Sequence, residues 1–138
     1  MKFGTALVLA LCLIGCGGGD DPDVVVGDFA MTSLRGVALP YDYVNGCCIY
    51  ESGSLELDED QYLVSGTFRN RNSSVTTTGW ESGTFQLDGD FLRFQPLSAN
   101  IAAFHLGHAT IHGDTIRLSL GGEGPGEPDS FAAVFVRQ

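Results

Sequence analysis

Apolar and polar residues alternate along most of this 138-residue chain, and almost nothing repeats at the spacing of a helix. In one run Tyr62, Val64 and Phe68 fall on one face, while Ser65 and Thr67 fall on the other. Successive side chains of a strand point to opposite faces of a sheet, so this pattern predicts strands with one buried and one wet side. Such half-polar strands are typical of antiparallel sheets. The sequence therefore predicts an all-β fold.

Clusters of Gly, Asp and Asn separate these segments at short spacing and mark tight turns. The predicted strands are 28–34, 47–57, 61–70, 74–81, 83–88, 90–95, 101–112, 114–120 and 130–137. Strands joined in this way form an up-and-down meander, which leaves two exposed edges unless it closes on itself. We therefore expect an antiparallel up-and-down meander closed into a small barrel of about eight strands, the number at which side chains just fill the interior.

An internal repeat supports the meander. The segment Ser52–Asp60 returns as Ser82–Asp90, and Ala109–Asp114 is a weaker third copy with the same turn. Asp88-Gly89 and His112-Gly113 supply residue types that accept the positive φ of a two-residue hairpin turn. We expect the repeat to be a hairpin, with the Ser-Gly pairs at the starts of strands.

The N-terminal segment has the features of a secretion signal. Lys2 precedes an apolar run from Ala6 to Ile14, which is shorter than the roughly 20 residues of a membrane-spanning helix. Its end, Leu13-Ile14-Gly15-Cys16, resembles a bacterial lipobox. The resemblance implies cleavage before Cys16 and attachment of acyl chains, palmitate included, to that residue. The expected organisation is a lipoprotein signal peptide at 1–15, a lipidated tether at 16–27 and a barrel domain at 28–138.

This lipoprotein signal predicts a location in the bacterial cell envelope, with the lipid on Cys16 as the membrane anchor. Gly17 follows the cysteine where an Asp would favour the inner membrane, so we expect the outer membrane. Residues 17–23 are Gly, Asp and Pro, a composition typical of a flexible spacer.

The charge balance excludes one class of partner. The formal net charge is −10 and becomes −11 once Lys2 leaves with the signal. Nucleic acids require a basic patch on their partners, so no nucleic acid is expected. A basic envelope protein remains a candidate partner.

Several short motifs follow one another in a fixed order. They lie at 33–40, 52–62, 83–94 and 108–118, and the last strand ends in Phe135-Val136-Arg137. Together they resemble those of small bacterial lipocalin-like domains, a mostly uncharacterised family. The resemblance implies a β-barrel and no particular chemistry. The chain departs from the family in Phe85, where many members have Tyr, and in its adjacent cysteines.

Cys47 and Cys48 are the free thiols expected in the processed chain. An oxidising compartment favours a disulfide, but neighbouring Cα atoms about 3.8 Å apart are closer than in ordinary disulfides. A vicinal disulfide, two reduced thiols with one in the core, and an intermolecular bridge or soft-metal site all remain open.

No catalytic or metal site is predicted. His105, His108 and His112 cannot reach one zinc ion from a single strand, because His108 and His112 would lie about 13 Å apart. The paired aspartates flank turns, where Asp forms local hydrogen bonds, and no nucleophile stands in a recognisable frame. We expect no enzyme activity and no cofactor.

Two functions lead, and envelope redox or metal sensing through Cys47 and Cys48 remains open as a third. The first is a binding module that holds a small apolar ligand in the barrel mouth, between 74–81 and 121–128, with Trp80 as the candidate contact. The second is a protein-interaction module, such as an inhibitor of lysozyme or protease, or an envelope-integrity factor. An apolar cavity favours the first function, and a filled barrel with an exposed acidic or aromatic patch favours the second.

Overall fold

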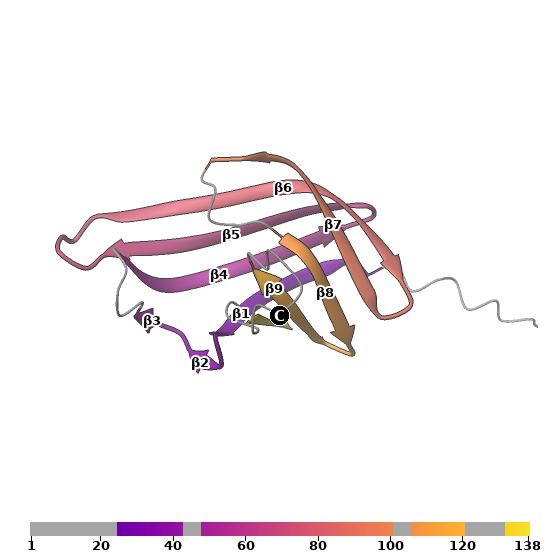
Figure 1. The fold of residues 1–138 in the computed structure, drawn as a ribbon, viewed down its shortest axis with the longest axis horizontal. Coiled ribbons are helices and arrows are strands. Elements are labelled where there is room, and N and C mark those ends of the chain that lie inside the picture. Colours follow the sequence, from indigo (N-terminus) through magenta and orange to yellow (C-terminus); the bar gives the residue numbers. More distant parts are fainter. Residues whose placement is uncertain (1–24, 43–47, 101–105, 121–131) are drawn as a thin grey trace, which may run out of the picture.

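The computed structural model describes residues 25–42, 48–100, 106–120 and 132–138, in which every regular element is a strand (Figure 1). Eight strands form the barrel: β1 (Gly27–Leu34), β4 (Cys48–Asp58), β5 (Gln61–Asn70), β6 (Thr76–Asp88), β7 (Phe91–Ala99), β8 (Leu106–His112), β9 (Thr115–Leu120) and β10 (Ala132–Arg137). Two short strands, β2 (Val37–Ala38) and β3 (Tyr41–Asp42), lie between β1 and β4. In these described ranges no helix is long and apolar enough to span a membrane.

The barrel is a closed antiparallel meander. Each barrel strand pairs with the next one along the chain. β1 pairs with β4 over Gly27–Ala30 and with β10 from Phe29 to Leu34. This double pairing closes the ring, so that each of the eight barrel strands has a neighbour on both sides along at least part of its length. The prediction of an all-β, up-and-down barrel of about eight strands is confirmed.

Inward-pointing side chains fill the space between the strands. Leu55, Val64, Leu92, Ile116 and Phe135 are 0 % exposed and come from five different strands. Full burial of one such side chain stabilises the fold by about 1.5–3 kcal/mol. Among the described residues, the barrel axis is thus occupied by an apolar core.

The predicted break between 81 and 83 is wrong, because β6 runs unbroken from Thr76 to Asp88. Ser and Gly favour turns, but here Gly83 lies where the register of β6 and β7 shifts. A Cβ on Gly83 would lie 2.1 Å from the carbonyl oxygen of Gln95. Glycine at this position permits the close approach of β7. Gly53 likewise lies inside β4 rather than at its start.

The strand before residue 100 also differs from expectation, because β7 continues through Pro96 to Ala99 instead of ending at 95. β8 is described from Leu106 to His112, in agreement with that part of the predicted strand 101–112, and residues 101–105 lie outside the described residues. β7 pairs with β8 only over Phe91–Arg93. Beyond that point β7 keeps only its β6 neighbour among the described strands, and such an edge tolerates a proline, which has no N–H to donate.

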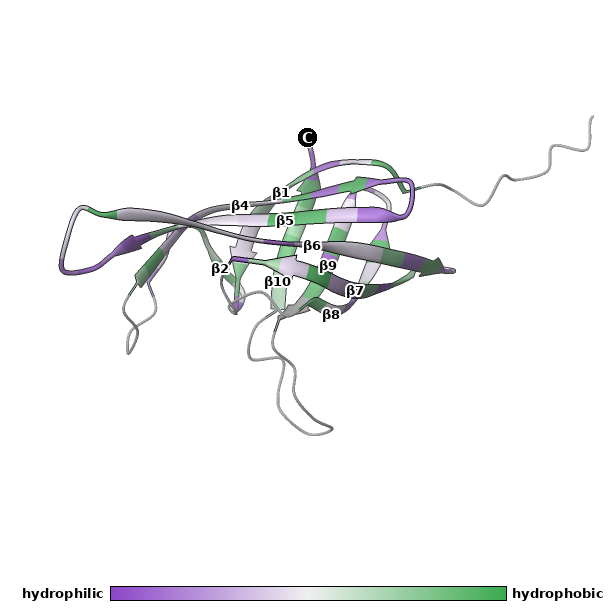
Figure 2. Ribbon diagram, turned by 90° about the horizontal axis from the view of Figure 1, so that it is seen from above, coloured by the Kyte–Doolittle hydropathy of each residue, from purple (hydrophilic) through white to green (hydrophobic). Residues whose placement is uncertain are grey.

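Strands β4, β5 and β6 extend past the barrel as an arm, which we define as β3 with residues 48–52, 67–70 and 76–78 (Figures 1 and 2). At its base Gly53, Gly66 and Gly79 pair with one another across the three strands. On the arm the rings of Tyr50 and Phe68 meet edge to face, with centroids 4.5 Å apart. The small residues at the base let the sheet bend where it leaves the barrel.

Candidate functional site: the turn end of the barrel

Three hairpins meet at one end of the barrel, which we call the turn end. They join β4 to β5, β6 to β7 and β8 to β9. In each, the backbone carbonyl of the last turn aspartate accepts a hydrogen bond from a backbone N–H of a later strand. The pairs are Asp60 with Phe85, Asp90 with Ile111 and Asp114 with Arg137, each at 2.8 Å. The predicted internal repeat is therefore a repeated hairpin, and each turn is hydrogen-bonded to a strand that comes later in the chain.

The turns also share their backbone conformation. Gly89 and Gly113 have φ of 64° and 58°, as their Asp-Gly and His-Gly pairs predict. The equivalent residue of the first hairpin is Glu59, with φ of 52°. A non-glycine residue in this left-handed region costs about 1–2 kcal/mol. The first copy of the repeat thus keeps the shape of the turn without its glycine.

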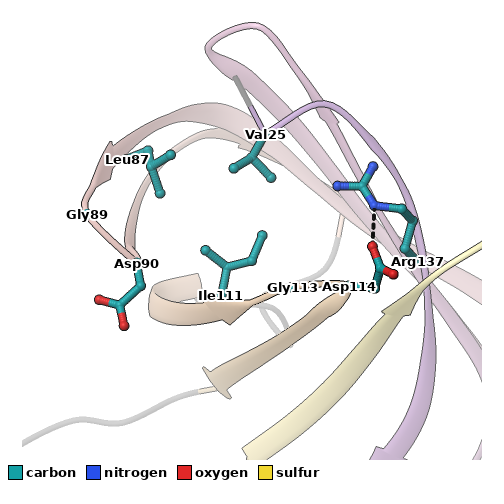
Figure 3. A pocket seen from close by; sticks show the side chains of 8 residues that line it. All are labelled: Val25, Leu87, Gly89, Asp90, Ile111, Gly113, Asp114 and Arg137. Atoms are coloured by element: carbon teal, nitrogen blue, oxygen red, sulfur yellow. Dashed lines mark hydrogen bonds and ion pairs between the residues drawn. The ribbon is translucent and has the colours of Figure 1, made fainter. Parts of the chain in front are cut away.

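A cavity of about 490 Å³ opens at the turn end (Figure 3). Val25, Leu87 and Ile111 point into it from the chain before β1, from β6 and from β8. Asp90 lies on one side of it, and the ion pair of Arg137 and Asp114 on the other. A pocket of this volume is large enough for a small molecule, and its lining is mixed, with three apolar side chains beside two carboxylates, an arginine and two turn glycines.

The cation of this cavity is already neutralised. Arg137 donates from Nε to Asp114 at 3.0 Å and from its terminal nitrogen to the carbonyl oxygen of Val26 at 2.7 Å. Its guanidinium also lies 4.8 Å from the ring centre of Phe29. On the opposite side, a carboxylate oxygen of Asp90 is 3.7 Å from Nδ1 of His112. The cavity therefore presents an apolar floor and a negative rim.

The wider turn end is acidic as well. Exposed carboxylates stand on all three hairpins: Asp58, Glu59, Asp60, Asp88, Asp90 and Asp114. The arm at the other end is balanced, since Arg69 pairs with Glu51 and Arg71 with Asp42. Among the residues that the structure describes, the exposed carboxylates are thus concentrated around the cavity.

A buried carboxylate lies elsewhere, inside the barrel wall. Glu81 is 1 % exposed and accepts a 2.7 Å hydrogen bond from the hydroxyl of Tyr62. The backbone N–H of Leu106 lies 3.4 Å from the same oxygen. At this height in the barrel β7 no longer pairs with β8, so the N–H of Leu106 has no carbonyl of β7 opposite it. The Glu81 side chain is the acceptor in its place. Burial, helped by the bond to Glu81, raises the pKa of Tyr62 far above its ordinary value.

The structure places Trp80 on the opposite face of the same strand. Trp80 pairs with Ser65, whereas Glu81 pairs with the fully buried Val64. The amide of Asn100 bonds the backbone of Trp80 and Thr78 at the edge of β6. Trp80 is therefore an outer-wall residue, and its ligand-binding role stays a prediction.

The predicted cysteine sites lie at or beyond the limits of the described residues. Cys48 is disulfide-bonded, while Cys47 and the lipidation candidate Cys16 lie outside the described residues, as does the loop 121–128. The vicinal pairing of Cys47 and Cys48 stays a prediction.

The histidines are separated. The ring of His108 stacks on Phe91 with centroids 5.3 Å apart, His112 faces Asp90, and His105 lies outside the described residues. Across the described ranges, no group of three His, Cys, Asp or Glu side chains is placed to hold a metal ion.

Sequence reasoning missed both Glu81 and the cavity. The alternation around Glu81 does carry a signal, because Gly79 and Gly83 are two residues away on either side and share its inward face. The cavity has no such signal, since its lining comes from four separate segments. Comparison with known proteins gives no match to any protein-family model and no match to a curated protein.

Proposed function

We propose that this protein is a non-enzymatic, lipid-anchored binding module of the bacterial envelope. Its ligand is a small molecule with an apolar body and one positive charge, bound in the turn-end cavity. The observation that carries this proposal is the cavity of about 490 Å³, with its apolar floor and its carboxylate rim. The lipocalin-like resemblance fits a binding role, although this cavity lies at the turn end and not in the predicted mouth.

The lining supports an amphiphilic cation. Val25, Leu87 and Ile111 favour an apolar body, because contact with it removes apolar surface from water. Asp90 favours an ammonium group, and the neighbouring turns add further negative potential. Arg137 offers no free charge to an anion because Asp114 already pairs with it.

The position of the cavity supports a role near the membrane. Val25 lines the cavity and lies nine positions after Cys16, with the eight residues 17–24 between them. A chain of nine such steps spans at most about 32 Å when fully extended. With lipid on Cys16, the cavity would stay within reach of amphiphiles that leave the membrane surface.

A titration with matched probes tests the proposal. Hexylammonium, hexanol and hexanoate share one apolar body and differ in charge, and methyl NMR signals of Val25, Leu87 and Ile111 report the cavity. We expect hexylammonium to shift these signals most and hexanoate least. Asp90→Asn should weaken hexylammonium binding about tenfold, the effect of about 1.4 kcal/mol, whereas Asp58→Asn on the neighbouring hairpin should leave it nearly unchanged. Equal binding of all three probes, or of none, contradicts the proposal.

The acidic turns favour one second candidate, a protein-interaction module that holds a basic enzyme such as lysozyme. Here the carboxylates of all three hairpins would act together as one surface. This function predicts inhibition of a basic lysozyme that Asp58→Asn and Asp88→Asn both relieve. Binding of hexylammonium without any inhibition would favour the small ligand instead.

A further inference from the structure

The outer face of β6–β9 differs in charge from the rest of this acidic protein. Arg93 and Arg117 are exposed on it, and within the described residues neither side chain contacts a carboxylate. The outward positions of β6, β7, β8 and β9 carry mainly Ser, Thr, Gln, His and Arg, together with Trp80 and Phe91, and Asp88 at the turn is their one carboxylate within the described part of these strands. An anion can therefore approach this face without meeting the repulsion found at the turn end.

The register brings the cationic groups into one area. Arg93 lies opposite His108 on β8, and Arg117 lies opposite Thr110, two residues further along the same strand. With strands about 4.8 Å apart and a rise of about 3.3 Å per residue, the Cα atoms of the two arginines are about 12 Å apart. Their long side chains can reach the two ends of a ligand the size of a disaccharide.

An aromatic ring holds two of these groups in place. His108 stacks on the ring of Phe91 at 5.3 Å and 21°, and the guanidinium carbon of Arg93 lies 5.6 Å from the centre of the same ring. Packing against Phe91 restricts both side chains before a ligand arrives, which lowers the entropy lost on binding. The Arg93 guanidinium keeps its planar set of donors for a carboxylate or phosphate.

Beside Arg93 the face is hollowed. A groove of about 300 Å³ is lined by Thr84, Gln86, Arg93 and Gln95, together with the inward-facing residues Phe85 and Phe94. Gln86 lies opposite Arg93, and Thr84 lies opposite Gln95. Amide and hydroxyl side chains both donate and accept hydrogen bonds, as the hydroxyl groups of a sugar do. The groove thus adds neutral polar recognition to the charge of the arginine.

We propose that the outer face of β6–β9 binds an acidic saccharide. Its carboxylate or phosphate pairs with Arg93 beside His108, its hydroxyl groups bond Gln86 and Gln95, and a second anionic group further along the chain meets Arg117. This site shares no residue with the turn-end cavity, so it stands or falls independently of the proposed function.

The test compares four probes on the full chain in a non-ionic detergent. They are a disaccharide of glucuronic acid and N-acetylglucosamine, the same disaccharide with glucose in place of glucuronic acid, inorganic phosphate, and vesicles containing phosphatidylglycerol. We expect the acidic disaccharide to bind with a Kd of about 1 mM, at least tenfold tighter than the neutral one. Its affinity should fall as salt rises, and NMR signals of Arg93 and His108 should shift on binding.

Variants locate the site. Arg93→Gln should weaken binding of the acidic disaccharide at least tenfold, and Gln95→Ala should weaken it severalfold without a change of charge. Arg69→Gln, on the arm, removes the same charge elsewhere and should have no effect. Phosphate that binds as tightly as the acidic disaccharide, vesicle binding that exceeds it, loss of binding in Arg69→Gln, or no shift with any saccharide would each overturn the proposal.

Discussion

At Gly83 the backbone of β7 occupies the space that a side chain would need. A methyl group there would lie 2.1 Å from the carbonyl oxygen of Gln95, an atom that cannot rotate away. We expect Gly83→Ala to lower the free energy of unfolding by about 3 kcal/mol, the upper range for overpacking. Gly107→Ala is the control, since nothing lies within 4 Å of its added methyl group. Urea unfolding measures both, and equal losses would contradict this account of Gly83.

Because of Tyr62, we expect the free energy of unfolding to fall at high pH. Burial raises its pKa in the folded state, while the unfolded chain ionises near pH 10. Its contribution is fully present below pH 10 and is lost as the pH rises above that value, by about 1.4 kcal/mol per unit. Urea unfolding between pH 9 and 11.5 should show this slope in the wild type and in Tyr41→Phe, but a flatter one in Tyr62→Phe.

The same variant tests the bond to Glu81 at neutral pH. Tyr62→Phe removes the 2.7 Å donor of a carboxylate that is 1 % exposed. A buried acceptor without its donor costs about 1–3 kcal/mol. We therefore expect Tyr62→Phe to be less stable than the wild type at pH 7, and unchanged stability there would mean that Glu81 has another sufficient partner.

At the scale of the elements, the three hairpins of the turn end differ in the residue type at the position of positive φ. Glu59 adopts φ of 52° where the other two turns have glycine. Glu59→Gly should raise the free energy of unfolding by about 0.5–1 kcal/mol, because relief of the left-handed strain exceeds the entropy cost of glycine.

Two reciprocal variants check that interpretation of the hairpins. Gly89→Ala should destabilise the β6–β7 turn by about 1 kcal/mol, since its φ is 64°. Asp58→Gly, one residue before Glu59, gains no relief and should be destabilising. Thermal unfolding of the three proteins would expose an error if Asp58→Gly and Glu59→Gly changed the Tm in the same direction.

At the scale of the whole molecule, closure depends on strands from the two ends of the described chain. Phe135 on β10 lies opposite Met31 on β1 and is 0 % exposed. Phe135→Ala should cost about 3–5 kcal/mol, whereas Val134→Ala on the half-buried outer face should cost much less. A small effect at Phe135 would show that the β1–β10 seam contributes little to stability.

Much of the fold was predictable because its signals are local. Alternation at Tyr62, Val64 and Phe68 identified the buried face of β5, and the glycines at 89 and 113 identified two turns. The functional residues were less predictable. Trp80 and Glu81 are neighbours on β6, and a shift of one residue exchanges the inner and outer faces, so residue type alone did not identify Glu81 as the inward-facing one of the pair.

By itself, the sequence determined the class of the fold and the order of its strands, because strand period and turn chemistry depend on residues a few positions apart. Tertiary structure alone decided that Gly83 lies within a strand, that Glu81 lies in the core, and that Val25, Leu87 and Ile111 line one cavity. It also placed Arg93 and Arg117 on one face, where neither contacts a carboxylate within the described residues. Each of these depends on which distant strands become neighbours when the sheet twists and closes, and no local pattern encodes that.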